Sequence, residues 1–393
     1  MTRLADRQLE MVLRNRVYFG AGAIARLPEV VAAAGGSRVF VVTDPGVRVS
    51  GVVDRVLTVL AEAGLETAVF DEVEPNPAAS TVERGAAALR QFGLDGTVIV
   101  PVGGGSSMDT AKALDLRAAN EPLSVWELDF DGPSLAYGRP LVAVPTTAGT
   151  GAETNAFGVI TDEAAGRKGY IGHPSLLPVA TILDPELTIG LPPAATAATG
   201  IDAMTHSLES LLSANPNPFA ESTAIGVIRT VVEWLPRAVA NGTDLEARSQ
   251  MLMASHLAGV GQASGTGVGL VHALGHALGT RGRLPHGTAL AVVLPEVLEF
   301  YRGIRDRELA MVGVALRVAS PTEDDTTAAT VAIGAIRTLC ETVDQRPKLR
   351  ALGFDEAMLD LVTEDAIADA AIRNSPRLPT LAEARSILAS IHG

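Results

Sequence analysis

The 393-residue sequence predicts an α/β domain with a parallel sheet over residues 1–188 and an all-helical domain over residues 189–393. Short valine-rich runs alternate with helix-period stretches up to Asp184, which is typical of a parallel sheet covered by helices on both faces. Beyond Pro193 almost only helical periodicity is found. The length also fits two domains, at about 150 residues for each.

The predicted strands are short apolar runs that end in polar or glycine-rich segments. They comprise residues 38–44, 66–70, 96–105 and 140–147, a run that ends at Asp184, and a short strand at 16–20. The clearest helical patterns between them cover residues 50–63 and 81–92. In the second domain, loops are expected at 215–218, 282–285 and 321–325. Ligands bind such sheets beyond the carboxyl ends of the strands, where Asp44, residues 103–106 and residues 146–150 would lie.

Composition excludes several classes of protein. With 45 acidic and 31 basic residues the net charge is −14, and no basic stripe offers a nucleic-acid surface. The single cysteine, Cys340, rules out a disulfide framework and a cysteine-based metal site. The most apolar stretch, residues 257–279, contains polar side chains and two histidines, which argues against a membrane span. Residues 1–20 lack the apolar run of a signal peptide, so we expect a cytoplasmic protein.

A glycine loop is the first motif that indicates chemistry. In VIVPVGGGSSMDTAKA a strand leads into Gly103, Gly104, Gly105 and Ser106, and then into a helix. Bare glycine backbone and the unpaired N–H groups of a helix N-terminus can hold a diphosphate. The Rossmann fingerprint fails because its third glycine position is Met108, and no Walker A sequence is present. The alternative is a tight turn without a ligand.

Asp44 follows the strand VFVVT and has two interpretations. Its carboxylate could accept hydrogen bonds from the ribose of an adenosine and repel a 2′-phosphate, which favours NAD over NADP. It could equally be the N-cap of a helix.

Histidines form two groups with spacings suited to a metal. Asp202 and His206 are four residues apart, as are His272 and His276, and His286 follows in LPHG. Residues four apart share one face of a helix. Because buried polar groups need partners, a carboxylate and several imidazoles in apolar surroundings favour a metal over packing. The HExxH pattern of metalloproteases is absent, since Ala273 follows His272. Spacing alone leaves the choice between His272 and His276 open.

Four motifs together resemble those of the iron-containing, group III alcohol dehydrogenases, which include lactaldehyde reductase and the butanol and 1,3-propanediol dehydrogenases. The motifs are GGGSSMDTAK, VPTTAGTGAE, PPAATAATGIDAMTHSLE and GLVHALGHALG with LPHG. FGAGA, PNP and SPRLP extend the likeness over nearly the whole chain. The resemblance implies hydride transfer between NAD(H) and a primary or secondary alcohol or aldehyde. It also implies a dinucleotide cleft in the α/β domain and a site for Fe²⁺, with Zn²⁺ as an alternative, in the helical domain.

The resemblance also implies roles for individual residues. The implied metal ligands are Asp202, His206, His272 and His286, and His276 would lie beside the nicotinamide and the substrate as the catalytic histidine. The implied cofactor-binding residues are Asp44, Asn76, Gly103, Gly104, Gly105, Ser106, Asp109, Thr146, Thr147, Thr150 and Lys168. In the family, a strand like residues 16–20 pairs across a two-fold axis. We therefore expect a homodimer, or a higher homo-oligomer, with Val17 and Phe19 in the contact.

Two questions stay open at this level. Ala263 stands where some short-diol enzymes of the family carry phenylalanine, so the natural substrate is not fixed. The competing functions are a dehydroquinate-synthase-like lyase, a glycerol-dehydrogenase-like member of the same superfamily and a non-catalytic nucleotide-binding protein. The lyase would need a basic pocket for a phosphorylated acid, and the helical half has no cluster of Lys and Arg beside the metal motifs.

Overall fold

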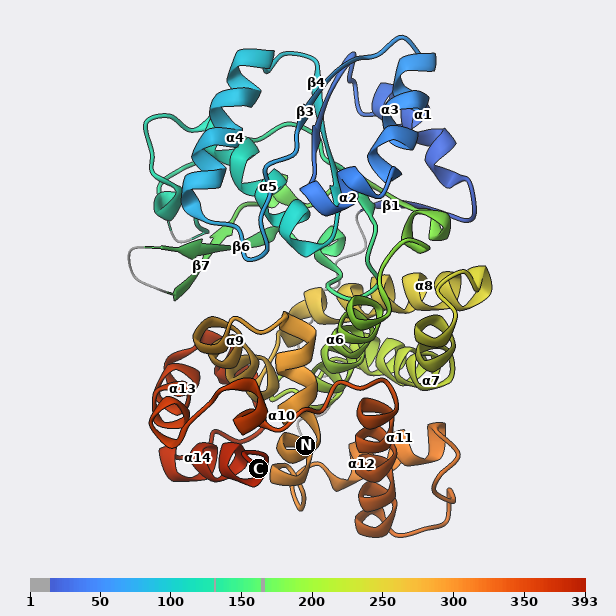
Figure 1. Cartoon of the computed structure of the whole chain (residues 1–393), viewed down its shortest axis with the longest axis vertical. Coiled ribbons are helices and arrows are strands. Elements are labelled where there is room, and N and C mark those ends of the chain that lie inside the picture. The colour runs from blue at the N-terminus through green and yellow to red at the C-terminus, as the bar shows by residue number, and fades with distance from the viewer. Residues whose placement is uncertain (1–14, 131, 164–166) are drawn as a thin grey trace. The chain divides into compact units, whose positions relative to one another are not determined.

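The computed structural model describes residues 15–130, 132–163 and 167–393. It divides the chain into two compact units that separate between Leu191 and Pro192. The first is an α/β unit and the second is helical (Figure 1). The segment for which no signal peptide is expected lies largely outside the described residues.

A six-stranded sheet forms the centre of the α/β unit. Its order is β1-β8-β5-β4-β2-β3, and every recorded pairing is parallel. The strands are β1 (Arg16–Phe19), β2 (Arg38–Val42), β3 (Glu66–Phe70), β4 (Thr97–Gly103), β5 (Val142–Pro145) and β8 (Ala180–Leu183). The expected parallel sheet is thus confirmed.

Helices cover both faces of this sheet, which explains why its strands are continuous apolar runs. Side chains alternate between the two faces of a strand. Phe40 and Val42 of β2 belong to the core under α4 (Ala79–Phe92) and α5 (Gly105–Ala119). Val39 and Val41 belong to the core under α1 (Leu27–Ala33) and α3 (Val52–Glu62). A short helix, α2 (Pro45–Val49), follows β2.

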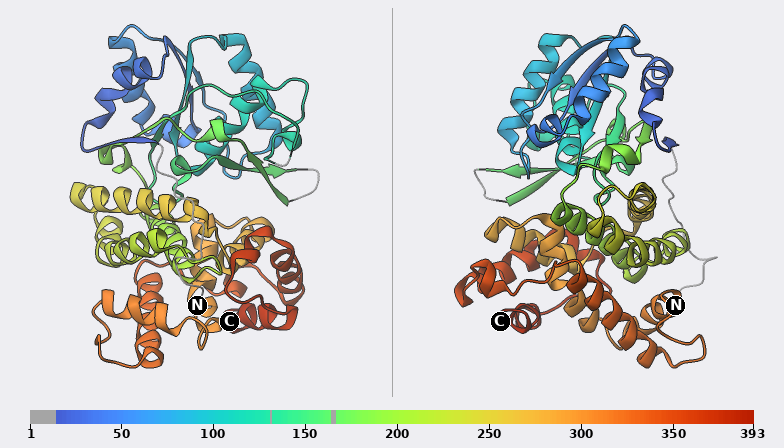
Figure 2. Two further views of the ribbon diagram at one scale, coloured as in Figure 1. Left: turned by 180° about the vertical axis from the view of Figure 1, so that it is seen from behind. Right: turned by 45° about the vertical axis from the view of Figure 1, so that its right-hand side comes forward.

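An antiparallel hairpin, β6 (Phe157–Asp162) and β7 (Arg167–Gly172), was not expected from the sequence. Figure 2 shows it standing apart from the main sheet. In β6 (FGVITD) Phe157, Val159 and Ile160 are apolar, but only Gly158 and Ile160 are buried, so the strand is buried on one face only. It therefore lacks the fully buried run that is typical of a central parallel strand.

A buried lysine fixes the start of this hairpin. Lys112 Nζ on α5 donates to the carbonyl oxygens of Ala152 (2.6 Å) and Phe157 (2.8 Å) and to Asn155 Oδ1 (2.8 Å). Burial lowers the pKa of Lys112 to about 8, against the opposing charge of Asp109. Three acceptors on one ammonium group tie α5 to the segment that leads into β6.

The second unit is helical throughout, as predicted, and the structure records no strand in it among the described residues. Its helices are α6 (Pro193–Leu212), α7 (Pro218–Ala240), α8 (Leu245–Gly261), α9 (Leu270–Gly282), α10 (His286–Phe300), α11 (Asp306–Ala315), α12 (Asp325–Thr342), α13 (Glu356–Ala368) and α14 (Leu381–Ser390). Among the described residues, no helix combines the length and apolar character needed to cross a membrane.

Short helical turns connect the main elements of both units. They are η2 (Ala23–Arg26), η3 (Val125–Glu127), η4 (Ala152–Thr154), η5 (Pro174–Leu176), η6 (Pro185–Thr188), η7 (Gln262–Thr266), η8 (Leu349–Leu352) and η9 (Ala370–Asn374).

Helix α6 is the central element of the helical unit. It packs against α7, α8 and α10, and every residue from Gly200 to Leu212 is buried. That stretch carries Asp202, His206 and Glu209, which are charged or polar side chains in a mostly apolar core. Burying such groups is costly unless they find partners, so their surroundings indicate what α6 is built to hold.

Candidate functional site

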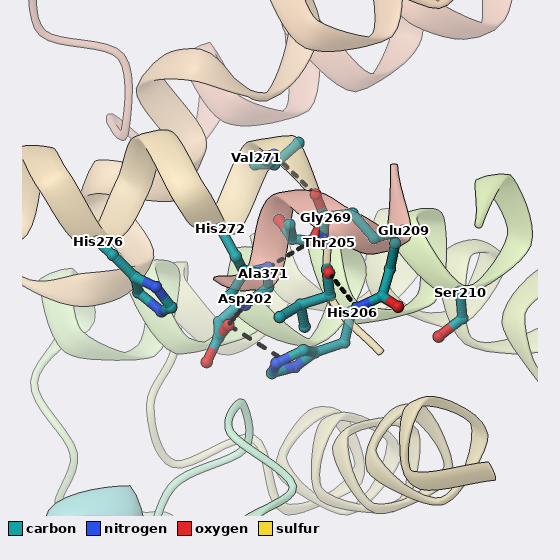
Figure 3. A network of polar contacts seen from close by, with 12 residues as sticks. Asp202, Thr205, His206, Glu209, Ser210, Gly269, Val271, His272, His276 and Ala371 are labelled. Carbon is teal, nitrogen blue, oxygen red and sulfur yellow. Dashed lines mark hydrogen bonds and ion pairs between the residues drawn. The ribbon is translucent and has the colours of Figure 1, made fainter. Parts of the chain in front are cut away.

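Three polar side chains share one face of α6. Asp202, His206 and Glu209 are spaced i, i+4 and i+7, which places them in one row along the helix. In Figure 3 Asp202 and His206 lie close to His272, which comes from α9. The two histidine groups seen in the sequence therefore meet in the folded structure.

Three imidazole nitrogens surround one carboxylate oxygen, which makes four potential metal donors. Asp202 Oδ1 lies 3.7 Å from each of three imidazole nitrogens, namely His206 Nδ1, His272 Nε2 and His286 Nε2. Ligand atoms with bonds of about 2.1 Å to one tetrahedral ion lie about 3.4 Å apart, so this spacing is close to that of a metal site. Asp202, His206 and His272 are buried, whereas His286 at the start of α10 is partly exposed.

The buried atoms of this group fit a divalent cation. Asp202 Oδ1 and His272 Nε2 make no hydrogen bond with the described residues, although both are buried. Burial alone would raise the pKa of Asp202, but the imidazoles of His206, His286 and His272 hold it well below its usual range. A carboxylate that stays ionised beside imidazole nitrogens matches the donor set of zinc or iron(II) sites.

Glu209 is a functional candidate that the sequence reasoning missed. Its Oε2 lies 2.6 Å from His272 Nδ1 and accepts the backbone N–H of Gly269 at 2.9 Å. Its Oε1 accepts the backbone N–H of Val271 at 2.7 Å. Burial lowers the pKa of His272, but Glu209 and Asp202 together raise it to about 9. A carboxylate on Nδ1 keeps that nitrogen protonated and turns Nε2 toward the cluster. The signal available in the sequence was its i+7 position after Asp202.

His276 lies one turn further along α9. Its ring centre is 5.8 Å from that of His272 and 5.5 Å from that of His286. Its Nδ1 is 2.8 Å from Oδ2 of Asp369, a residue that the sequence reasoning also missed. The structure thus gives His272 and His276 different carboxylate partners, Glu209 and Asp369.

Gly287 explains why a glycine follows His286. A Cβ atom at this position would lie 1.9 Å from the carbonyl oxygen of Ala198 on α6, which is far inside van der Waals contact. Only glycine lets the first turn of α10 approach α6 this closely. That approach brings His286 near Asp202.

The glycine loop of the α/β unit joins β4 to α5. Gly103 has a φ of +158°, and a Cβ there would lie 2.3 Å from Ser107 Oγ. Helix α5 begins at Gly105, and Ser106 is its second residue. The N-cap residue, Gly104, has no side chain that could cap the first N–H groups of the helix. The first N–H groups of a helix can hold an anion, and diphosphate binding by this loop stays a prediction.

Asp44 is the N-cap of α2, as one of its two interpretations required. Its Oδ1 accepts the N–H of Val47 at 3.0 Å. Its Oδ2 lies 3.4 Å from Ser107 Oγ, beside the glycine loop. The cap uses only one carboxylate oxygen, so a contact of the other with a ribose stays a prediction.

Three threonines lie against the same loop. The N–H of Thr146 donates to the carbonyl oxygen of Gly103 at 3.0 Å. Thr147 and Thr150 lie next to the Cα positions of Gly104 and Gly105, within the reach of an added Cβ. The structure therefore brings these predicted cofactor residues together at the carboxyl ends of β4 and β5.

The remaining predicted cofactor residues lie around the β6–β7 hairpin. Asn76 has a positive φ of 54°, and its carbonyl oxygen accepts the hydroxyl of Thr161, which pairs in register with Lys168. Burial raises the pKa of Asp109 to about 6, while the charges of Lys112 and Lys168 act in the opposite direction. Lys168 is thus linked electrostatically to Asp109 on α5.

The two units supply the parts of a metal-dependent oxidoreductase. The helical unit holds the group of Asp202, His206, His272 and His286, and the α/β unit holds a glycine loop at the end of a parallel sheet.

Comparisons with known proteins define this class further. The family model for iron-containing alcohol dehydrogenase matches residues 14–185, and that for the C-terminal part of the Fe-containing alcohol dehydrogenase family matches residues 196–392. The chain is 36% identical to 1,3-propanediol dehydrogenase of Klebsiella pneumoniae over 376 residues, covering 95% of this chain and 96% of the relative. It is 33% identical to NAD-dependent methanol dehydrogenase of Bacillus methanolicus over 371 residues, covering 94% and 96%.

A solved structure agrees with these matches. The crystal structure of a 1,3-propanediol oxidoreductase superposes with a TM-score of 0.93 at 36% identity, covering 98% of this chain and 100% of that one. The chain belongs to the iron-containing alcohol dehydrogenase family, and it is an enzyme that interconverts alcohols and aldehydes. The resemblance read from the sequence motifs is thus confirmed.

Proposed function

We propose that this alcohol dehydrogenase holds Fe²⁺ through Asp202, His206, His272 and His286, and that it uses NAD(H). The observation that carries the metal assignment is the buried Asp202 oxygen with three imidazole nitrogens at 3.7 Å. Zn²⁺ is the alternative, because nitrogen-rich sites generally bind zinc more tightly than iron(II). The metal in use then depends on supply as well as on the ligands.

Each group in the helical unit has a defined task in this proposal. A bound divalent metal supplies Lewis acidity, which lowers the pKa of an alcohol. Glu209 holds His272 in the orientation and tautomer that the ligand role requires. His276 exchanges a proton with the substrate alcohol, directly or through water or ribose hydroxyls, as a general acid and base.

The cofactor assignment rests on the α/β unit. The N-terminus of α5 and the glycines before it suit the diphosphate; Asp44 lies beside them, and Asp109 follows on α5. We assign Asn76 and Lys168, which lie around the β6–β7 hairpin, to the same cofactor. NAD, when bound, supplies the hydride acceptor, and the protein supplies orientation. The name of the Bacillus methanolicus relative, which includes NAD dependence, supports this choice.

The domain roles follow from the same residues. We assign cofactor binding to residues 1–188 and metal binding and catalysis to residues 189–393. A cytoplasmic location stays a prediction of the sequence.

A screen of NADH oxidation over a panel of aldehydes tests this function. The protein is first stripped of metal and then reloaded with Fe²⁺, Zn²⁺ or buffer alone. We expect turnover only after reloading, together with about one metal ion per chain by elemental analysis. Equal turnover in the stripped and reloaded samples would exclude a metal-dependent mechanism.

The preference for NADH should depend on the charge of Asp44. The variant Asp44→Ser keeps an N-cap side chain for Val47 but removes the charge that would face a 2′-phosphate. We expect NADPH use to rise by about tenfold, which corresponds to the roughly 1.4 kcal/mol of one charge interaction in a partly exposed site. Steady-state kinetics with both cofactors measure this change. If the unmodified enzyme uses NADPH as well as NADH, Asp44 is only a cap.

The oligomeric state is the second property that we propose from the strand at residues 16–20. Among the described residues β1 lies at one edge of the sheet, and Phe19 is 45% exposed. An edge strand leaves backbone groups that a second chain can pair with, and two-fold dimers are the commonest homo-oligomers. We therefore propose a homodimer, or a higher assembly built from it, with Val17 and Phe19 in the contact.

Two proline variants of β1 test the two sides of this strand, one that pairs with β8 and one that faces away from it. The N–H groups of Arg16 and Gly20 donate toward β8, so by alternation the N–H of Tyr18 does too, and that of Val17 points outward. Val17→Pro should thus leave the sheet intact and produce monomers, whereas Tyr18→Pro should destabilise the sheet itself. Light scattering and thermal unfolding distinguish these results. An unmodified protein that is monomeric at micromolar concentration would contradict the dimer.

A further inference from the structure

Two histidines on α9 are held in the same way by carboxylates from different parts of the chain. His272 Nδ1 lies 2.6 Å from Glu209, and His276 Nδ1 lies 2.8 Å from Asp369. In both cases Nδ1 takes the carboxylate, so that Nε2 of each ring is turned away from it. Glu209 serves a proposed metal ligand, whereas Asp369 serves a histidine with a different proposed task.

Asp369 uses its two oxygens for two different partners. Oδ1 accepts the N–H of Ala371 at 2.8 Å, which makes Asp369 the N-cap of η9. Oδ2 contacts His276 Nδ1, across 93 residues of sequence. The side chains of His276 and Asp369 are only 11% and 16% exposed, so water competes little for this hydrogen bond.

We propose that Asp369 is the positioning residue of His276, an inference that rests on the catalytic role proposed for that histidine. The carboxylate accepts the Nδ1–H of His276 and thereby leaves the lone pair on Nε2. During alcohol oxidation the O–H bond of the substrate breaks and an Nε2–H bond forms, while the hydride leaves the carbinol carbon for NAD⁺. In the reverse direction Nε2 returns the proton to the product alcohol. In this role Asp369 keeps its charge throughout and transfers no proton itself.

The cap on Ala371 makes this proposal sharply testable. In Asp369→Asn one atom of the new amide must accept the Ala371 N–H, and only the amide oxygen can do so. The NH₂ group then faces His276 Nδ1 and can only donate to it. This arrangement favours the tautomer with the proton on Nε2, which cannot accept a proton from the substrate. The substitution therefore keeps the cap and the shape of the side chain while it reverses the tautomer of the histidine.

The measurement is kcat and KM of metal-loaded Asp369→Asn, with metal content determined on the same sample. We expect kcat to fall about 10²-fold, the lower part of the range for a general acid or base, with metal content retained and KM changed less than threefold. Asp355→Asn is the matched control, because Asp355 caps α13 through the N–H of Met358 at 2.8 Å and has no recorded contact with a histidine among the described residues. It should keep full kcat.

A double-mutant cycle with His276→Ala separates positioning from a structural effect. If Asp369 acts through His276, then Asp369→Asn should lower kcat no further once His276 is alanine. Two results would contradict the role of Asp369 while leaving that of His276 intact. One is a double variant in which the two losses of kcat multiply, and the other is normal kcat in Asp369→Asn together with low kcat in His276→Ala. Full kcat in His276→Ala would instead show that the proposed catalytic role of His276 is wrong.

Discussion

His272→Ala is expected to release the metal and to lower kcat/KM by about 10³-fold or more. A Lewis acid supplies several kcal/mol to the barrier, and each 1.36 kcal/mol corresponds to a tenfold change in rate. We expect a large effect at His272 because both ring nitrogens have defined partners. Its buried Nε2 lies 3.7 Å from Asp202 Oδ1, and its Nδ1 lies 2.6 Å from Glu209. Elemental analysis and steady-state kinetics on the same preparation measure the two losses together.

A control histidine from the α/β unit makes this result specific. His173 contacts the side chain and backbone of Ser175 and lies at the start of η5 (Pro174–Leu176). His173→Ala should keep the full metal content and nearly full activity. If His272→Ala retains a stoichiometric metal ion, the assignment of His272 as a ligand is wrong.

His276→Ala should have the opposite signature, with metal retained and kcat lowered by about 10²- to 10⁴-fold. The same substitution is made one turn away on the same helix, so differences in helix propensity or burial contribute little. The reason for the different outcome is that His272 Nε2 lies 3.7 Å from Asp202 Oδ1, within the donor group, whereas the recorded partner of His276 is Asp369. Proton transfer slows when its donor and acceptor is removed, while the group around Asp202 keeps its four donors.

The two variants form a matched pair that tests the division of roles on α9. Both are measured for metal content, for kcat and for NADH affinity by fluorescence titration. We expect NADH affinity to change little in His272→Ala. A metal-free His276→Ala protein would show that the role proposed for His276 is wrong.

Part of this enzyme could be predicted because its signals are local. The valine-rich runs identified the strands of the parallel sheet, since a strand buried on both faces must be apolar along its whole length. Asp202 with His206, and His272 with His276, were recognisable because residues four apart share a helix face. The strand β6 was not predicted because it is buried on one face only and its short apolar stretch ends at Thr161 and Asp162.

The roles of the two histidines on α9 were beyond local patterns. His272 and His276 lie four residues apart on one helix face, and both have apolar neighbours in the sequence. The sequence pattern alone therefore could not tell which histidine is a metal ligand and which transfers a proton. The resemblance to a known family implies a choice, and the position of His272 Nε2 3.7 Å from Asp202 Oδ1 supports it, while both roles stay predictions. Glu209 and Asp369 lie 63 and 93 residues from their histidines, and only folding brings each carboxylate to one ring.

The sequence by itself determined the strands of the parallel sheet, the helical character of the second domain, the glycine loop and the set of titratable side chains that could bind a metal. These depend on periodicity and on residue chemistry within a few turns of chain. Only the tertiary structure decided that three imidazole nitrogens lie at equal distance from Asp202 Oδ1. It also decided that residue 287 must be glycine, because a Cβ there would collide with α6. Those features arise from the packing of α6, α9 and α10, whose contacts join residues far apart in the chain, and no local pattern records such contacts.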